Sequence, residues 1–460
     1  MEARSETRTR SSLPSPPPLL VFCVPSSPSR PDHDMSNRTL LRLGKELKHL
    51  HANPDYGVFV AVQEANMTTV KAAILGPEGT PYAYCLFEFL LTFSADYPSI
   101  APICRAQTTN ESRTRFNPNI YADGKVCLSI LGTWRGERGE GWSSAQGLES
   151  VLISVHSLMG SDPYKNEPGY ESVTSSRHRD EAGKYVQKIR HESLRIAVIE
   201  RIERYLGIIS WPAFKKDKGW EPFVDLSKRL FLWYYTEYVQ IIHKENKTVS
   251  VNQAFAKMPF EHPGNTMDGQ FNYPGLLRRL EKIRALIDEE TTSWQALGRD
   301  AVSLQRGVAA SLLAQYDQGV QHFAGSPLSV DLSLKEGGNP FVWSVTLFGP
   351  PMTQLDGGVF HFTICFSPNF PDTQPRVQFT TPMFHVNITA DGIPYYRIQK
   401  IDNAIAHVDG VIALLNTEPA VDPRTHLNSE AAGLYWGNSS QKEQYAKKLR
   451  RAVTRSVDFF

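Results

Sequence analysis

Two stretches of the chain, 74–102 and 347–375, align with each other over their full length without a gap. A second pair follows, in which FNPNIYADGKVC at 116–127 matches FHVNITADGIPY at 384–395. Turn-forming and aromatic residues that agree in one register indicate an internal repeat, so the chain contains two copies of one domain. The coinciding residues are Gly76 and Pro77 with Gly349 and Pro350, Phe87 with Phe360, Phe93 with Phe366, and Pro98 with Pro371.

The first copy shows a clear order of elements. Leucines recur at helical spacing within 38–54, which predicts an amphipathic helix. Short apolar segments separated by Gly/Pro turns come next, a pattern typical of an antiparallel meander. Two further helical patterns follow, at 144–160 and 179–206. This order predicts an α+β fold with a meander sheet and flanking helices, present twice.

The 460 residues divide into four parts by composition. Residues 1–35 are rich in Ser, Pro and Arg and are predicted to form a disordered tail, in which Met35 is an alternative start. The two copies occupy 36–205 and 299–460. Between them, 206–298 carries amphipathic helix patterns and many aromatic residues, so we expect a folded helical extension rather than a solvated linker.

Composition limits the class of function. Lys and Arg number 49 and Asp and Glu 48, whereas a nucleic-acid binder carries a strong basic excess, so we expect no nucleic-acid partner. No apolar run approaches the roughly 18 residues of a membrane span, so we expect no membrane partner. The five cysteines are scattered and form no group with zinc-ligand spacing. We therefore expect no metal, and a reducing location in the cytoplasm, the nucleus or both.

Cys127 is the candidate reactive residue. A lone cysteine is most often a small buried hydrophobe, so chemistry at this position needs further support. A cysteine protease would need a histidine nearby and a redox site a second cysteine, and neither is local in sequence. Transthiolation needs neither, because the incoming thioester is already activated. It needs a hydrogen-bond donor for the oxyanion, which an amide such as Asn119 can supply.

The segment NPNIYADGKVCLSIL resembles the His-Pro-Asn … Cys signature of ubiquitin-conjugating enzymes, and Asn119 and Cys127 keep the family's spacing of eight. LGPEGTPYAYCLFEFLLTFSADYPSIAP resembles the family's second and third strands with their Pro-rich loop. SVLISVHSLMGSDPYKNEPGYE is similar to its helix and acidic loop after the cysteine. The likeness covers 38–205. NPN, KVCLSILGTW and the extension up to about Asp288 resemble the class Z members.

The resemblance implies a set of roles. Cys127 would be the thioester nucleophile, Asn119 the amide that binds the oxyanion or orders the loop, and Glu167 the acid that orients or deprotonates the acceptor lysine. From the residues alone, Asn119 can also be purely structural and Glu167 a solvated loop acid. The implied partners are ubiquitin or a ubiquitin-like modifier, an ATP-dependent activating enzyme, a ligase and protein substrates. No cofactor is implied.

Three departures from the family pattern stand in the first copy. The usual motif histidine is Asn117. The ligase-docking loop, usually Phe followed by Lys, reads Ser99 and Ile100, and its partner loop has Ser144 where proline is usual. Loss of a buried aromatic anchor weakens interfaces strongly, so docking onto standard ligases is expected to differ.

The second copy resembles the inactive variants of the same family. Tyr395 takes the place of the cysteine, Asn387 is retained, and Cys365 lies in a strand pattern that favours core packing. We predict that this copy is non-catalytic and serves as a binding or scaffolding module. An alternative for the whole chain is a modifier-binding scaffold with a vestigial cysteine, against which the intact motif from Asn119 to Cys127 argues.

Overall fold

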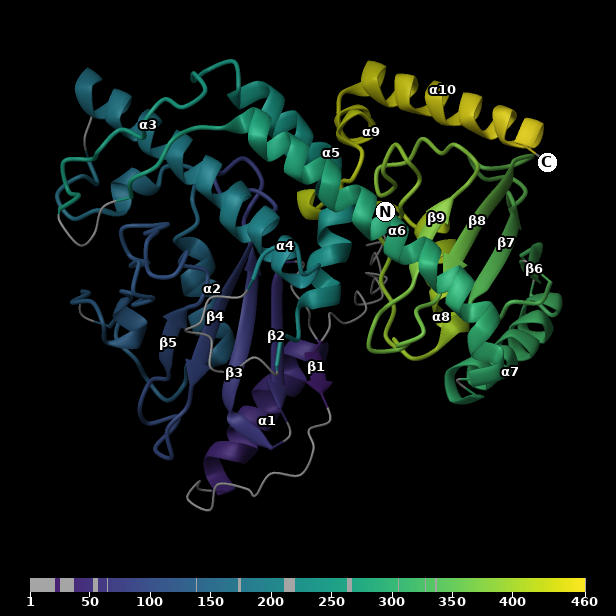
Figure 1. Cartoon of the computed structure of the whole chain (residues 1–460), viewed down its shortest axis with the longest axis horizontal. Helices are drawn as coiled ribbons and strands as arrows, with labels where there is room; N and C mark the ends of the chain where they lie inside the picture. Colours follow the sequence, from purple (N-terminus) through teal and green to yellow (C-terminus); the bar gives the residue numbers. More distant parts are fainter. Residues whose placement is uncertain are drawn as a thin grey trace, which may run out of the picture.

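The chain folds into two α+β units with a helical extension between them, as Figure 1 shows. Within the described residues, the first unit has a five-stranded sheet and the second a four-stranded one. The α+β fold class and the repeat predicted from sequence are confirmed. The computed structural model describes residues 21–24, 37–52, 57–63, 65–137, 139–172, 175–210, 220–262, 267–304, 306–326, 328–335 and 337–459.

The strands of the first sheet lie in chain order, and all but the first pairing are antiparallel. Most apolar residues of the second to fourth strands are buried, as the alternating and continuous apolar segments of the sequence predict, whereas Ile103 at the start of the fifth is exposed. The strands are β1 (Val21–Val24), β2 (Val58–Gln63), β3 (Asn66–Leu75), β4 (Leu86–Thr92) and β5 (Ile103–Ala106).

The predicted disordered tail at 1–35 is wrong for Val21–Val24, which form strand β1 parallel to β2. The physical reason is the outer edge of β2, whose free backbone N–H and C=O groups accept a further strand. The other residues of 1–35 lie outside the described part of the chain.

Two helices of the first unit pack against β3. Helix α1 (Asn37–Ala52) buries Leu43 and Leu47, the centre of its predicted leucine stripe. Helix α2 (Leu148–Ser157) follows the candidate loop and buries four apolar residues against the same core. Short 3₁₀ turns lie on either side of α2, at Ser129–Leu131 and Pro163–Asn166.

The predicted helix at 179–206 is three consecutive segments. Helix α3 (Ser176–Glu192) passes into a π-helical segment, Ser193–Glu200, and then into α4 (Arg201–Tyr205). The π-helical segment packs against β4 and against the extension. Arg201 forms a buried ion pair with Glu88 of β4, which fixes this end of the helix run to the sheet.

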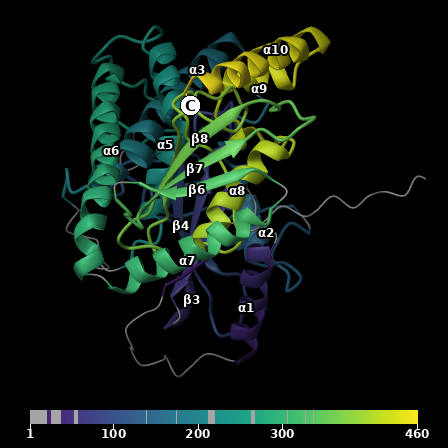
Figure 2. The ribbon, with the colours of Figure 1, turned by 90° about the vertical axis from the view of Figure 1, so that its right-hand side faces the viewer.

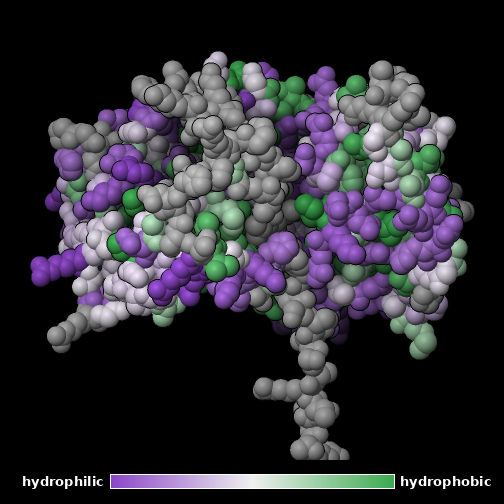
Figure 3. All heavy atoms as spheres, turned by 90° about the horizontal axis from the view of Figure 1, so that it is seen from below, coloured by the Kyte–Doolittle hydropathy of each residue, from purple (hydrophilic) through white to green (hydrophobic). Residues whose placement is uncertain are grey.

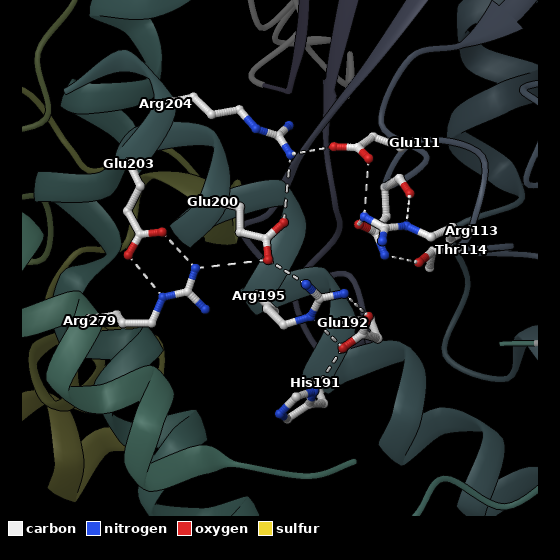
Figure 4. Close-up of polar contacts among 11 residues, drawn as sticks. Glu111, Arg113, Thr114, His191, Glu192, Arg195, Glu200, Glu203, Arg204 and Arg279 are labelled. Atoms are coloured by element: carbon white, nitrogen blue, oxygen red, sulfur yellow. Dashed lines mark hydrogen bonds and ion pairs between the residues drawn. The ribbon is translucent and has the colours of Figure 1, made fainter. Parts of the chain in front are cut away.

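Charged side chains on this helix run form a network with the extension (Figure 4). Arg195 pairs with both Glu192 and Glu200. Arg279 of the extension donates to Glu203 through Nε at 2.9 Å and Nη2 at 2.6 Å. The extension is therefore fastened to the first unit by polar contacts as well as by apolar packing.

The extension consists of α5 (Val224–Glu245) and the long helix α6 (Tyr273–Leu304), which pack against each other. Their apolar residues belong to the same continuous core as those of the first sheet, so the predicted folded extension is confirmed. Helix α6 continues without a break through the predicted boundary between 298 and 299, and reaches β8 of the second unit. The other domain boundaries stay predictions.

The second unit has a separate core. Figure 2 looks onto this unit, with α10 above the strands and α7 below them. Its elements follow the order of the first unit: α7 (Arg306–Ala324), β6 (Val330–Leu334), β7 (Val342–Phe348), β8 (Val359–Cys365), β9 (Arg376–Phe379), α8 (Ala404–Asn416), a 3₁₀ turn (Pro423–Thr425), α9 (Ser429–Tyr435), α10 (Ser439–Ser456) and a final 3₁₀ turn (Val457–Phe459).

The two units meet through the extension. Trp233 of α5 donates from its indole N–H to the Pro394 carbonyl at 3.0 Å, and Tyr234 donates to the Arg424 carbonyl at 2.6 Å. Asp225 accepts from Arg376 at 2.8 Å, where both side chains are buried. The second unit is therefore attached through loop residues and through Arg376 at the start of its edge strand β9.

The lower face of the molecule is mainly polar. In Figure 3, hydrophobic residues of the described part show as small separate spots among hydrophilic ones. No helix in the described ranges combines the length and apolar character that crossing a membrane requires.

Candidate active site around Cys127

Cys127 and Asn119 are tied together by two hydrogen bonds. The Cys127 backbone N–H donates to the Asn119 carbonyl at 2.8 Å, and Asn119 Nδ2 donates to the Cys127 carbonyl at 2.9 Å. The amide of Asn119 thus orders the loop in this structure, one of the two roles that the resemblance implies. Cys127 is 3% exposed, and a 3₁₀ turn follows it.

Asn117, which replaces the usual histidine, is fully buried, and both the oxygen and the nitrogen of its side-chain amide form hydrogen bonds that hold the motif. Its Oδ1 accepts from the Asn119 backbone N–H at 2.9 Å. Its Nδ2 donates to the Leu158 carbonyl at 2.8 Å, and the Tyr82 hydroxyl lies 3.2 Å away. The residue therefore joins the Cys127 loop to the end of α2.

The second unit shows what a histidine does at the same position. His385 stands where the first unit has Asn117, and its Nδ1 accepts from the Asn387 backbone N–H at 3.1 Å. Burial lowers the pKa of His385 to about 4, so the ring stays neutral and keeps this acceptor. An asparagine oxygen and a neutral imidazole nitrogen perform the same task, which explains how the first unit keeps its motif without histidine.

Thr133 is a supporting residue that the sequence reasoning missed. Its hydroxyl accepts from the Leu128 N–H at 3.0 Å and donates to the Val126 carbonyl at 2.6 Å. These bonds bracket Cys127 on both sides and close the short turn behind it. The available signal was LGTW after the cysteine, because threonine commonly bonds to nearby backbone.

Glu167 lies in the loop after α2 and is held by Arg115. Arg115 Nη2 lies 3.0 Å from a Glu167 oxygen and donates to the Pro118 carbonyl at 2.6 Å. The guanidinium therefore links Glu167 to the Asn119 loop. Glu167 is not a solvated loop acid in this structure, because its side chain is only 18% exposed.

Tyr121 connects Cys127 with this ion pair. The Arg115 guanidinium stacks over the Tyr121 ring at 4.8 Å. Burial raises the pKa of Tyr121, the nearby Cys127 raises it further, and Arg115 acts in the opposite direction. Tyr121 and Arg115 were missed from sequence, although Tyr121 is inside the motif and Arg115 directly precedes it.

Cys85 and Cys104 sit in the core of the first unit. Burial raises the pKa of the Cys85 thiol, and it raises the pKa of Cys104 to about 12, so neither is a ready nucleophile. Cys365 is buried on β8, where its sulfur accepts from Gln295 Nε2 at 3.3 Å. Among the described residues, no cluster of His, Cys, Asp and Glu could hold a metal ion.

The two loops expected to dock a ligase lie beside a tryptophan. Ser99, Ile100 and Ser144 are exposed. Trp142 donates its indole N–H to the Pro98 carbonyl at 2.8 Å and lies 6.0 Å from the Tyr97 ring. An aromatic residue that follows Cys127 in the chain therefore packs against this surface, next to the position where the family's usual phenylalanine is missing.

The second unit repeats the hydrogen bond that orders the Cys127 loop, but helix α5 of the extension covers the position equivalent to Cys127. The Tyr395 N–H donates to the Asn387 carbonyl at 2.8 Å, the same bond as between Cys127 and Asn119. Asn387 Nδ2, however, donates to the Thr425 carbonyl instead. The Tyr395 ring lies 4.5 Å from Trp233 of α5, and the residue belongs to the core of the first unit and extension.

The comparisons with known proteins identify the family of this chain. The family model of the ubiquitin-conjugating enzyme matches residues 42–193 and again 321–453. The chain is 37% identical to ubiquitin-conjugating enzyme E2 Z of Danio rerio over 255 residues, 55% of this chain and 70% of that protein. It is 35% identical to E2 Z of Xenopus tropicalis over 280 residues, 60% of this chain and 82% of that protein.

A third similar protein is the human dual E2 ubiquitin-conjugating enzyme/E3 ubiquitin-protein ligase BIRC6, 43% identical over 148 residues, 32% of this chain but 3% of that protein. The fold and the two matched regions define a protein with two ubiquitin-conjugating domains. The chain belongs to the ubiquitin-conjugating enzyme family, and within it is similar to the E2 Z proteins. Membership implies contacts with ubiquitin, an activating enzyme and ligases.

Proposed function

We propose that this ubiquitin-conjugating enzyme carries ubiquitin as a thioester on Cys127 and transfers it to lysine amines of protein substrates. The observation that carries the proposal is the reciprocal pair of bonds between Asn119 and Cys127. This pair fixes the backbone of Cys127 beside Asn119, and Asn117 and Thr133 support it from either side.

Charging exchanges one thioester for another. The Cys127 sulfur, as thiolate, attacks the carbonyl carbon of ubiquitin held on the activating enzyme. The new C–S bond forms as the bond to the activating enzyme's sulfur breaks, and that sulfur leaves as a thiolate. No external energy is needed at this step, because ATP has been consumed earlier, on the activating enzyme.

Discharge replaces the thioester by an amide. The lysine nitrogen attacks the same carbonyl, the Cys127 sulfur leaves, and the nitrogen loses a proton. Asn119 stabilises the oxyanion when its Nδ2 releases the Cys127 carbonyl and donates to the substrate oxygen instead. This change costs the loop one hydrogen bond. Glu167, oriented by Arg115, is the carboxylate that attracts the lysine and accepts its proton.

The second unit serves as a non-catalytic module. A phenol at Tyr395 forms no labile thioester, and its ring is buried against Trp233 of α5. The loop that would receive a modifier is thus used to attach the unit to the extension. Retention of the fold with a tyrosine in place of the cysteine supports a scaffolding role for this half of the chain.

The atypical docking loops support an altered choice of ligase. Ser99 and Ile100 offer no aromatic anchor, and Ser144 replaces the partner loop's proline. A ligase that recognises this enzyme therefore contacts a surface supported by Trp142.

A charging assay on a non-reducing gel tests the proposal. Full-length protein with activating enzyme, ATP and ubiquitin should gain a thiol-sensitive adduct, which Cys127→Ala should lose and the matched control Cys365→Ala should keep. An undiminished adduct on Cys127→Ala would contradict the carrier role. Protein that binds ubiquitin but gains no adduct with any of a panel of activating enzymes and modifiers would favour the scaffold.

A further inference from the structure

A cavity of about 470 Å³ lies where the extension meets the second unit. Its walls come from α5, from α6, from β8 and β9, and from the 393–398 segment that contains Tyr395. Figure 1 shows α6 crossing from the first unit toward the second sheet at this place. Ligand sites occur preferentially at domain junctions, and this volume is within the usual range for small-molecule pockets.

The charged residues of the wall are mostly cationic. Five of them are basic and one is acidic: Arg229, Arg284, Lys335, Arg376 and Arg397, with Asp288. His407 also lines the cavity, and burial lowers its pKa to about 3, so it adds no charge. The wall therefore carries a clear excess of positive charge around neutral pH.

The neighbouring carboxylates balance only part of this excess, because Arg284 pairs with both Asp288 and Asp391. Arg229 and Arg376 share one buried partner, Asp225. Lys335 donates to the Thr363 hydroxyl at 3.0 Å rather than to a carboxylate. Buried cations are costly unless each is paired, so two guanidinium groups on one carboxylate leave a demand for further negative charge.

Arg229 and Arg376 each have one guanidinium nitrogen that is buried without a hydrogen-bond partner among the described residues. These nitrogens are Arg376 Nε and Arg229 Nη2. Arg376 is 92% buried, because its exposed fraction is 8%. Buried donors are almost always satisfied in folded proteins, so these two arginines together carry more positive charge and more donors than Asp225 satisfies.

Aromatic residues form another part of the wall. Trp233, Tyr395 and Tyr396 line the cavity beside the basic side chains. Trp233 and Tyr396 are partly exposed, so the exposed parts of their rings can receive a planar group. A simple inorganic ion would use the charges but not these rings.

From this geometry we propose that the junction cavity binds a small phosphate-bearing molecule with a planar ring, held by the guanidinium groups and stacked on the aromatic wall. Phosphate suits this site because guanidinium groups bind its oxygens in pairs. A ligand here touches α5, α6 and the second unit at once, so it ties the second unit to the extension.

Calorimetric titration of the full chain with AMP tests the proposal, with inorganic phosphate, adenosine and citrate as separate arms. AMP should bind at one site per chain and more tightly than phosphate or adenosine, and it should raise the melting temperature. Citrate that binds as tightly as AMP, or no saturable AMP binding at low millimolar concentration, would overturn the proposal.

A variant at the exposed rim of the cavity locates the site without endangering the fold. Lys335→Met should weaken AMP binding about tenfold, the usual size of a lost charged hydrogen bond. Lys335→Arg should restore it. Lys447→Met, an exposed lysine of α10, is the matched control and should leave affinity unchanged. Equal affinity of the Lys335→Met and wild-type proteins would place binding elsewhere and refute the site.

Discussion

Replacing Asn119 by alanine separates the two roles that its amide can have. The substitution removes the 2.9 Å hydrogen bond to the Cys127 carbonyl and leaves that part-buried oxygen without its partner. A bond of this kind contributes about 1 kcal/mol to the free energy of unfolding. Loss of an oxyanion donor costs more, about 10²-fold in rate. We therefore expect a small loss of stability, nearly normal charging, and discharge to lysine slowed about 10²-fold.

Asn387→Ala is the matched control, because it removes an amide hydrogen bond of 2.7 Å at the equivalent position of the second unit. It should lower stability by a similar amount, about 1 kcal/mol, and leave discharge unchanged. The assay is single-turnover discharge of preformed thioester to free lysine, beside denaturant unfolding. Charging and discharge that fall equally for Asn119→Ala would refute the oxyanion role and assign the residue to loop order. Slowed discharge in Asn387→Ala would refute the division of labour between the units.

Three further outcomes follow. Burial lowers the pKa of His385 from 6.5 to about 4, so between these pH values the unfolded chain binds a proton that the folded chain does not. Acid should therefore lower the free energy of unfolding by up to about 3 kcal/mol. His385→Asn keeps an acceptor for the Asn387 N–H and should lose this part of the pH dependence, measured by denaturant unfolding. Glu167→Gln keeps a partner for Arg115 and should slow discharge but not charging in single-turnover assays, and equal rates for both proteins would remove Glu167 from the mechanism. Tyr395→Cys should gain no second adduct in a Cys127→Ala background, because the position is covered by the extension, and a thiol-sensitive adduct there would contradict the non-catalytic assignment.

The fold was predictable where the sequence pattern repeats or alternates. The leucine stripe of α1 and the meander of β2 to β5 were expected, and the gapless repeat predicted the second sheet. The π-helical segment Ser193–Glu200 was not, because its apolar pattern is that of any helix and its form depends on packing against β4 and α6. Strand β1 was missed because the six residues between Pro18 and Pro25 carry no periodic signal.

Contacts of the site between residues that are close in sequence were predictable, whereas contacts between residues far apart in sequence were not. Asn119 and Cys127 are eight residues apart in one motif, and the structure joins them as expected. The link from Arg115 to Glu167 spans 52 positions and depends on how the loop after α2 folds back, which no local pattern encodes. The contact of Tyr395 with Trp233 likewise needs the placement of a whole unit.

The most direct test of the account is the site of attachment on a Cys127→Ser variant. A serine hydroxyl at this position should form an oxyester with ubiquitin, which resists thiols and is cleaved by hydroxide. Mass spectrometry after proteolysis should find the C-terminal remnant of ubiquitin on the peptide that contains position 127, and Cys365→Ser should show none on its own serine. A remnant on any other residue of the Cys127→Ser protein, or a thiol-sensitive adduct that persists in it, would contradict the assignment of Cys127 as the carrier.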